Sequence, residues 1–168
     1  MKRLLLDTNI YGLLAGDPEA SFLIELCELK KEHFLVYGFS LIRKELRETS
    51  KKKTFLGRNL RVALLNLYDK ITGNHILIVE PHLLLGIAEN YLTTYRLLGG
   101  NFSKNELLKD FIIVACASKK GMDIVVSQDD ATMLSDLALR AYTIVNTNLQ
   151  LNNPKFLDYN EFKALLRR

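Results

Sequence analysis

The chain has 168 residues, of which 48% are hydrophobic and 25% charged, and its formal net charge is +4. This balance is typical of one soluble globular domain and excludes a disordered or fibrous chain. No apolar run approaches the roughly 20 residues that a membrane-spanning helix needs, and the start, MKRLLLDTN, lacks a signal-peptide pattern. We therefore expect a cytoplasmic protein with no membrane partner.

The first half of the chain alternates between strand and helix patterns. KRLLL at residues 2–6 predicts a short buried strand, and GDPEASF predicts a helix with Asp17 as its N-cap. The β-prone run at 34–40 predicts a second strand, followed by a helix that begins near Leu41 and is interrupted by the polar segment 49–57. This half ends with a predicted helix over 59–73, stopped by Gly73, and a third strand over 75–80.

The second half continues the alternation. Residues 82–98 carry a long apolar stripe, and Ser103 with Glu106 forms a capping-box pattern at the start of a helix over 104–121. The remaining predicted elements are a fourth strand over 122–127, a helix over 131–141, a candidate fifth strand over 142–145 and a final helix over 158–168. The alternation predicts an α/β fold with a central, mostly parallel β-sheet of four to five strands flanked by helices.

The two cysteines, Cys27 and Cys116, each lie in an apolar stretch that predicts a helix. No Cys or His spacing typical of a zinc site accompanies them. We expect both to be small core residues.

Acids occur where predicted strands end. Asp7 and Asp129 each follow an apolar strand directly, and Glu45 lies five residues beyond the end of the second strand. In parallel sheets, ligands bind outside the carboxyl ends of the strands. Asp110 lies inside the strongly apolar helix sequence KDFIIVACA, where burying an unpaired carboxylate costs several kcal/mol. A bound cation would offset that cost.

Each acid taken alone also has another explanation. Asp7 could cap the next helix, or could be a nucleophile as in haloacid-dehalogenase-type phosphatases, although the second Asp that such an enzyme needs is here Asn9. Glu45 could be a solvated charge on a helix, and Asp129 or Asp130 could cap one. Asp110 could form an ion pair with Lys30 or Lys119.

Taken together, the segments LLLDTNIYG, SLIRKEL and KDFIIVACASKKGMDIVVSQDD resemble a PIN-domain nuclease over roughly residues 2–147. The resemblance implies a single PIN-like domain over 1–168, with 148–168 as a C-terminal helical extension. It also implies that four catalytic acids bind Mg²⁺ or Mn²⁺, namely Asp7, Glu45, Asp110 and Asp129, with Asn9 and Ser127 as polar supports. Asp110 lies two turns into its helix rather than near the start, which makes Glu106, one turn earlier on the same face, a further supporting candidate.

A ring of carboxylates suits a hard dication, because Mg²⁺ prefers oxygen ligands and keeps several waters. Such an ion lowers the pKa of bound water and clamps phosphate oxygens. The resemblance accordingly implies a metal-dependent endoribonuclease that leaves 5′-phosphate and 3′-hydroxyl ends. Small members of the family are most often VapC-type toxins, inhibited by an antitoxin protein and commonly homodimeric. A housekeeping RNA-processing or decay nuclease is a second possibility, and a non-catalytic RNA-binding scaffold is a third.

A dense basic stretch follows Glu45 and contains Phe55 as a candidate stacking side chain. Its basic residues are Arg43, Lys44, Arg47, Lys51, Lys52, Lys53, Arg58 and Arg61. Such a stretch could follow an RNA backbone, with salt-dependent and weakly sequence-selective binding. It could equally be a solvated helix face and loop.

Overall fold

The computed structural model describes residues 1–55 and 57–168, and the side chains of Phe55 and Arg58 lie outside the description. One parallel sheet contains β1 (Lys2–Leu6), β2 (Phe34–Phe39), β5 (Ile76–Leu77), β6 (Ile124–Val126) and β7 (Lys155–Leu157). A separate antiparallel pair consists of β3 (Thr54–Phe55) and β4 (Arg58–Asn59). The predicted α/β fold with a central parallel sheet of four to five strands is confirmed.

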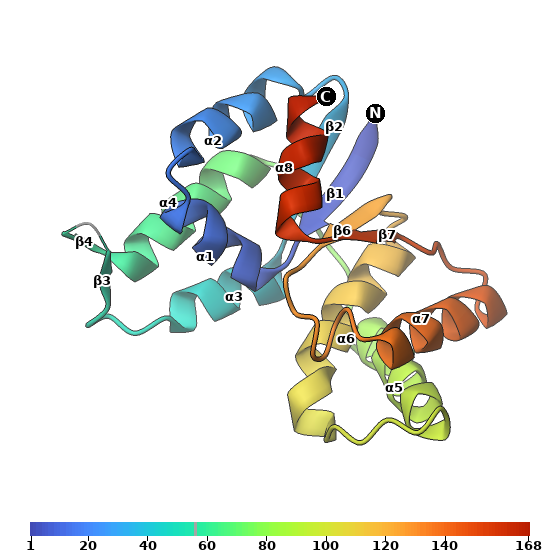
Figure 1. The fold of residues 1–168 in the computed structure, drawn as a ribbon. Helices are drawn as coiled ribbons and strands as arrows, with labels where there is room; N and C mark the ends of the chain where they lie inside the picture. The colour runs from blue at the N-terminus through green and yellow to red at the C-terminus, as the bar shows by residue number, and fades with distance from the viewer. Residues whose placement is uncertain (56) are drawn as a thin grey trace.

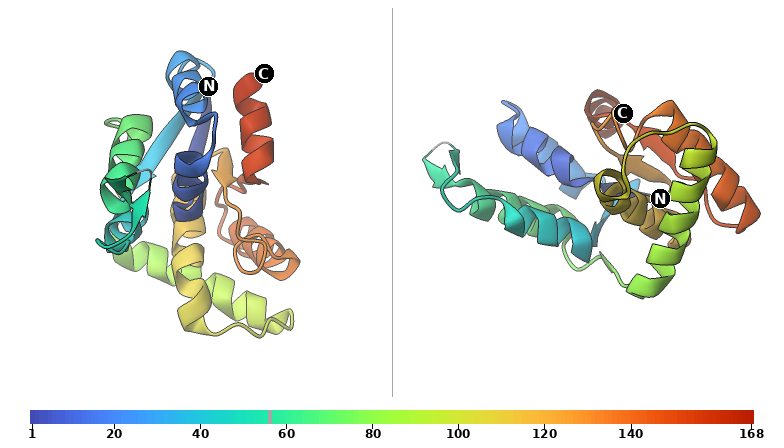
Figure 2. Two further views of the ribbon diagram at one scale, coloured as in Figure 1. Left: turned by 60° about the vertical axis from the view of Figure 1, so that its left-hand side comes forward. Right: turned by 90° about the horizontal axis from the view of Figure 1, so that it is seen from below.

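Helices surround this sheet. They are α1 (Thr8–Gly16), α2 (Ala20–Leu29), α3 (Ser40–Glu48), α4 (Leu60–Thr72), α5 (Pro81–Leu97), α6 (Lys104–Lys119), α7 (Asp136–Asn148) and α8 (Tyr159–Arg167). Figure 1 shows α1 to α4 gathered at one side of the sheet and α5 to α7 at the other, and Figure 2 gives two further views of these groups. The leucines of β1 are 0% exposed, as expected for a strand that is covered on both faces.

The order of the strands is β5-β2-β1-β6-β7. From β1 the chain moves outward to β2 and then β5, whereas β6 and β7 are added on the other side of β1. The order therefore reverses between β1 and β6. In open α/β sheets, this reversal opens a crevice at the carboxyl ends of the two strands, and ligands bind there.

The predicted strand over 142–145 is wrong. These residues belong to α7, where Ala138, Ala141, Tyr142 and Val145 are buried at helical spacing. The β-prone types Tyr, Thr, Ile and Val misled the prediction, because packing overrides such propensities. The fifth strand is instead β7, inside the segment 148–168 that was expected to be only a helical extension.

Some predicted boundaries also shift. α2 begins at Ala20, and Asp17 ends α1 as its C-cap while its side chain accepts a hydrogen bond from the Glu19 amide. The helix predicted over 131–141 begins only at Asp136, and the third strand is limited to β5. The predicted capping box of α6 is confirmed, and so is the stop of α4 at Gly73, where φ is 53°.

The remaining predictions concern the core and the membrane. Cys27 and Cys116 are both buried and free, which confirms them as core residues. None of the helices in the described ranges combines the length and apolar character needed to cross a membrane.

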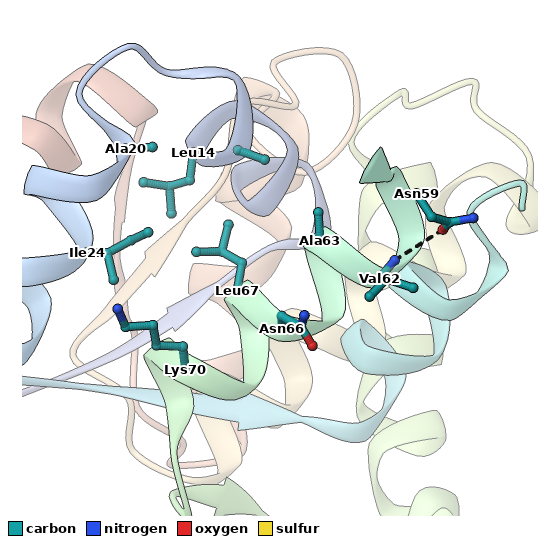
Figure 3. Close-up of a pocket in the computed structure, with 10 residues that line it drawn as sticks. Leu14, Ala20, Ile24, Asn59, Val62, Ala63, Asn66, Leu67 and Lys70 are labelled. Atoms are coloured by element: carbon teal, nitrogen blue, oxygen red, sulfur yellow. Dashed lines mark hydrogen bonds between the residues drawn. The ribbon is translucent and has the colours of Figure 1, made fainter. Parts of the chain in front are cut away.

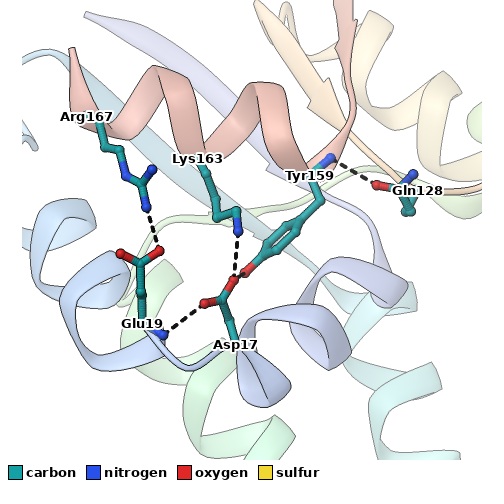
Figure 4. Close-up of polar contacts among 6 residues, drawn as sticks. All are labelled: Asp17, Glu19, Gln128, Tyr159, Lys163 and Arg167. Atoms are coloured by element: carbon teal, nitrogen blue, oxygen red, sulfur yellow. Dashed lines mark hydrogen bonds and ion pairs between the residues drawn. The ribbon is translucent and has the colours of Figure 1, made fainter.

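The C-terminal helix α8 is fastened to the turn between α1 and α2 (Figure 4). Asp17 accepts hydrogen bonds from the Tyr159 hydroxyl at 2.9 Å and the Lys163 ammonium at 3.0 Å. Arg167 pairs with Glu19 at 2.5 Å. At the start of α8, the Tyr159 amide donates to the side chain of Gln128, which follows β6. α8 therefore connects the α1–α2 turn with the loop after β6.

Candidate metal centre

Asp7 lies at the carboxyl end of β1 and is the N-cap of α1. The residue is 5% exposed, and its carboxylate accepts three hydrogen bonds, from the Thr8 amide at 2.6 Å, the Asn9 side chain at 2.8 Å and the Ser127 hydroxyl at 2.8 Å. The capping role therefore holds, but every donor to Asp7 is neutral. Capping does not exclude metal binding, because each carboxylate oxygen has two lone pairs.

Asn9 and Ser127 join the loops that follow β1 and β6. The Asn9 side chain donates to the Ser127 hydroxyl at 3.2 Å and accepts from the Gln128 amide at 3.2 Å. The Ser127 hydroxyl also accepts from the Asp129 amide at 3.2 Å. Both residues thus have the supporting contacts that the sequence suggested, and they fix Asp129 relative to Asp7.

Asp110 and Asp129 meet at the hydroxyl of Thr132. This hydroxyl contacts Oδ2 of Asp110 and, at 2.7 Å, Oδ2 of Asp129. Asp129 also accepts from the backbone amides of Ala131 and Thr132. Because a threonine hydroxyl has a single hydrogen to donate, it can satisfy only one of the two carboxylates at a time. A proton on either acid would supply the second hydrogen bond.

Glu45, in α3, approaches from the β2 side of the sheet. Its Oε2 accepts from the Thr8 hydroxyl at 2.5 Å, and its Oε1 lies 3.3 Å from the Lys109 ammonium. The Glu45 side chain is 18% exposed, whereas that of Lys109 is 58% exposed. Glu45 is therefore linked to Asp7 through Thr8, and a flexible surface cation is its second partner.

The electrostatics of the acids follow from burial and mutual repulsion. Burial raises the pKa of Asp7 to about 6 against its hydrogen bonds from Ser127 and Thr8, and the charges of Glu45 and Asp129 raise this pKa further. Burial likewise raises the pKa of Asp110 to about 7, with added repulsion from Asp7, Asp129 and Glu45. All four acids therefore interact electrostatically around one region.

Electrostatic interaction among the acids does not by itself make a geometry that coordinates a metal ion. In residues 1–55 and 57–168, no group of three or more His, Cys, Asp or Glu side chains is arranged to hold a metal ion. Instead, the Thr132 hydroxyl lies between Asp110 and Asp129, and the Thr8 hydroxyl donates to Glu45. The donor chemistry nevertheless fits Mg²⁺ or Mn²⁺, because it consists of carboxylates and hydroxyls without sulfur or imidazole. Within the described part of the chain, Asp7, Asp110 and Asp129 have no Lys or Arg ion pair that would already neutralise them.

Two sequence-based candidates are placed elsewhere. Glu106 is exposed and accepts from the Ser103 amide and hydroxyl, so it caps α6 and is removed from the candidate site. Asp130 is exposed and does not cap α7, whose N-cap is Ser135. The ion pair considered for Asp110 with Lys30 or Lys119 does not form, since Thr132 is its partner.

Sequence reasoning missed Thr132, Lys109 and the link through Thr8. Thr132 lies three residues after Asp129, which is the spacing at which an Asp side chain caps a backbone turn. Lys109 directly precedes Asp110, but nothing in the sequence indicates that it turns toward α3. Such contacts depend on how α3 and α6 pack, which local patterns do not specify.

The predicted basic stretch is partly committed to internal contacts. Arg43 forms two hydrogen bonds of 3.0 Å with Asp69, and the Arg61 guanidinium donates to the Thr49 carbonyl at 2.7 Å. The members that remain exposed are Lys44, Arg47, Lys51, Lys52 and Lys53. Arg58 and Phe55 are also candidates for RNA binding, but their side chains lie outside what the structure describes.

A separate apolar pocket of about 830 Å³ opens between α1, α2 and α4 (Figure 3). Leu14, Ile24 and Leu67 form much of its wall, and Lys70 stands at its edge. None of the four acids lines it. It is therefore not the metal centre.

No family model matches the sequence, and no curated protein matches it either.

Proposed function

We propose that the chain is a metal-dependent endoribonuclease of the PIN type, in which Asp7, Glu45, Asp110 and Asp129 bind Mg²⁺ or Mn²⁺. One observation supports the proposal: buried and half-buried acids from four separate segments repel one another near the carboxyl ends of β1 and β6, and Asp7, Asp110 and Asp129 have no ion pair with Lys or Arg in the described residues. Carboxylates that are withdrawn from water in this way are normally paired with a cation.

A dication bound there supplies the chemistry of phosphodiester hydrolysis, by lowering the pKa of a bound water and by neutralising charge on the phosphate. The protein's own part is to hold the carboxylates. Asn9 and Ser127 orient Asp7, Thr132 aligns Asp110 with Asp129, and Thr8 connects Glu45 to α1. Hydrogen bonds of this kind fix the direction of metal ligands and commonly change metal affinity 10- to 100-fold when they are removed.

RNA as the substrate is supported by the exposed lysines of the segment 51–53 and by Lys44 and Arg47 in α3, the helix that carries Glu45. Such positive charges bind a polyphosphate backbone without reading its sequence. The expected antitoxin and the expected homodimer stay predictions.

The direct test is cleavage of a structured RNA by the purified protein with Mn²⁺ or with EDTA. We expect cleavage with Mn²⁺ that leaves products with 5′-phosphate ends. In EDTA we expect no cleavage. Asp110→Asn should abolish cleavage, while Glu106→Gln, an acid of the same helix that only caps it, should keep it. Equal cleavage by wild type and Asp110→Asn would contradict the catalytic assignment.

A further inference from the structure

Lys109 is the only described Lys or Arg side chain that forms an ion pair with one of the four acids. Its ammonium lies 3.3 Å from Glu45 and 3.9 Å from Glu48, both in α3, and its side chain is 58% exposed. It directly precedes Asp110 in α6. A solvent-exposed positive charge therefore lies beside the proposed metal centre.

The pair between Lys109 and Glu45 is suited to being broken. Glu45 is half-buried, but the Lys109 ammonium is exposed, so water screens its charge and its long side chain loses freedom in the pair. Oε2 of Glu45 accepts a hydrogen bond from the Thr8 hydroxyl, and Oε1 faces the Lys109 ammonium. A dication has twice the charge of an ammonium and approaches an oxygen to about 2.0–2.1 Å. It would therefore displace Lys109 from Glu45 and also repel it.

We propose that Lys109 is a substrate-phosphate contact that Glu45 holds in the metal-free protein and releases when a dication binds. The inference rests on the proposed function. A lysine ammonium binds phosphate as a compact point charge, and here it is already exposed beside the acids. The exchange couples the two ligands: metal binding frees a group that attracts the RNA backbone, and RNA binding removes a competitor of the metal.

The experiment compares Lys109→Gln with a matched control, Lys104→Gln. Lys104 belongs to the same helix, is 45% exposed and pairs with Glu89 at 2.8 Å, so Lys104→Gln also removes one lysine–glutamate pair of α6, but one that does not involve the four acids. In Mn²⁺ titration calorimetry, we expect Lys109→Gln to bind Mn²⁺ about two- to fivefold more tightly than wild type, because the competitor for Glu45 is gone. Lys104→Gln should match wild type.

The second readout is binding of a fluorescent 12-nucleotide single-stranded DNA, which carries the same phosphates, at several salt concentrations. With Mn²⁺, Lys109→Gln should bind several-fold more weakly, and its slope of log K against log salt should be shallower by about 0.7, the loss of one phosphate contact. In EDTA the variant should resemble wild type, because Glu45 holds the lysine there. Lys109→Arg should restore the Mn²⁺-dependent binding.

The outcomes separate the two proposals. If wild type binds Mn²⁺ but Lys109→Gln behaves like Lys104→Gln in both assays, Lys109 is only a surface pair and the inference is wrong. A loss of strand binding that is equal in Mn²⁺ and EDTA would also overturn it, because no release would have occurred. If wild type binds no Mn²⁺, the proposed function itself fails and this inference fails with it.

Discussion

The two ends of α1 carry two aspartates with opposite electrostatics. Asp7 at the start is 5% exposed, and burial raises its pKa to about 6. The Asp17 side chain at the other end is 7% exposed, and its pKa is lowered by a hydrogen bond from the Glu19 amide and by Lys163 (Figure 4). As whole residues, Asp7 is buried and Asp17 is half-buried, so the difference has two sources: the deeper burial of Asp7, and the partners that stabilise the charge of Asp17.

The contacts of Asp17 are those expected of an acid with a structural role. It has a lysine and a tyrosine hydroxyl from α8, and these contacts hold one helix against another. Asp7 has only neutral donors, with Glu45 and Asp129 as charged neighbours that repel it. Asp7 thus lacks the positive charge that Asp17 receives from Lys163, and a dication would provide it.

The largest effect should come from removing the Asp7 charge. We expect Asp7→Asn to reduce RNA cleavage by about 100-fold or more, because a lost ligand should cost at least as much as the loss of its supporting contacts. Asp17→Asn should leave the cleavage rate of the folded protein nearly unchanged. Single-turnover cleavage of one RNA by both variants tests this, and similar losses would mean that the two aspartates do not differ in role.

The free energy of unfolding should respond in the reverse order, with Asp17→Asn more destabilising than Asp7→Asn. Asp17→Asn should lower the free energy of unfolding by about 2 kcal/mol, because it weakens charge-assisted hydrogen bonds to Lys163 and Tyr159. Asp7→Asn in EDTA should unfold at the wild-type urea concentration or above, since it removes a buried and repelled charge. Urea unfolding of the two variants measures the difference, and a larger loss for Asp7→Asn would contradict the contrast.

Substitutions of Thr132 test whether the contacts that orient the acids contribute to metal binding. Thr132→Val keeps the shape of the side chain but removes the hydroxyl shared by Asp110 and Asp129. We expect Mn²⁺ affinity to fall about tenfold, as for other contacts that orient metal ligands. Thr132→Ser, which retains the hydroxyl, is the control, and equal affinities for valine and serine variants would show that the contact has no part in metal binding.

The smallest expected effect is on pH dependence. Because the folded-state pKa values of Asp7 and Asp110 are about 6 and about 7, the metal-free protein holds protons that the unfolded chain, with pKa values of 3.8, releases. Their stabilising contribution is full below about pH 4 and is lost as the pH rises through about 7.

Melting curves in EDTA should therefore show a midpoint that falls by a few degrees between about pH 5 and about pH 8. The stabilisation by Mn²⁺ should grow over the same range, because binding requires deprotonated carboxylates. Asp110→Asn should flatten the EDTA profile. A wild-type profile that is already flat would show that the two pKa values are not raised.

Sequence reasoning reached the features that local chemistry determines. The order of most strands and helices and the capping box of α6 follow from short patterns, whereas the roles of the four acids and of Asn9 and Ser127 come from a resemblance and stay predictions. It failed where packing decides: residues 142–145 became helix, and β7 arose from a segment without a strand pattern. The partners of Glu45 and Asp110 likewise depend on how α3, α6 and the loop after β6 meet.

The most direct test of the central claim is calorimetric titration of the wild-type protein with Mn²⁺ at about pH 7.5, where both raised carboxyl groups are mostly ionised, beside Asp110→Asn. The account predicts saturable binding of Mn²⁺ to wild type that disappears or weakens strongly in the variant. Absence of binding to wild type at millimolar Mn²⁺, or binding of equal affinity to both proteins, would contradict it.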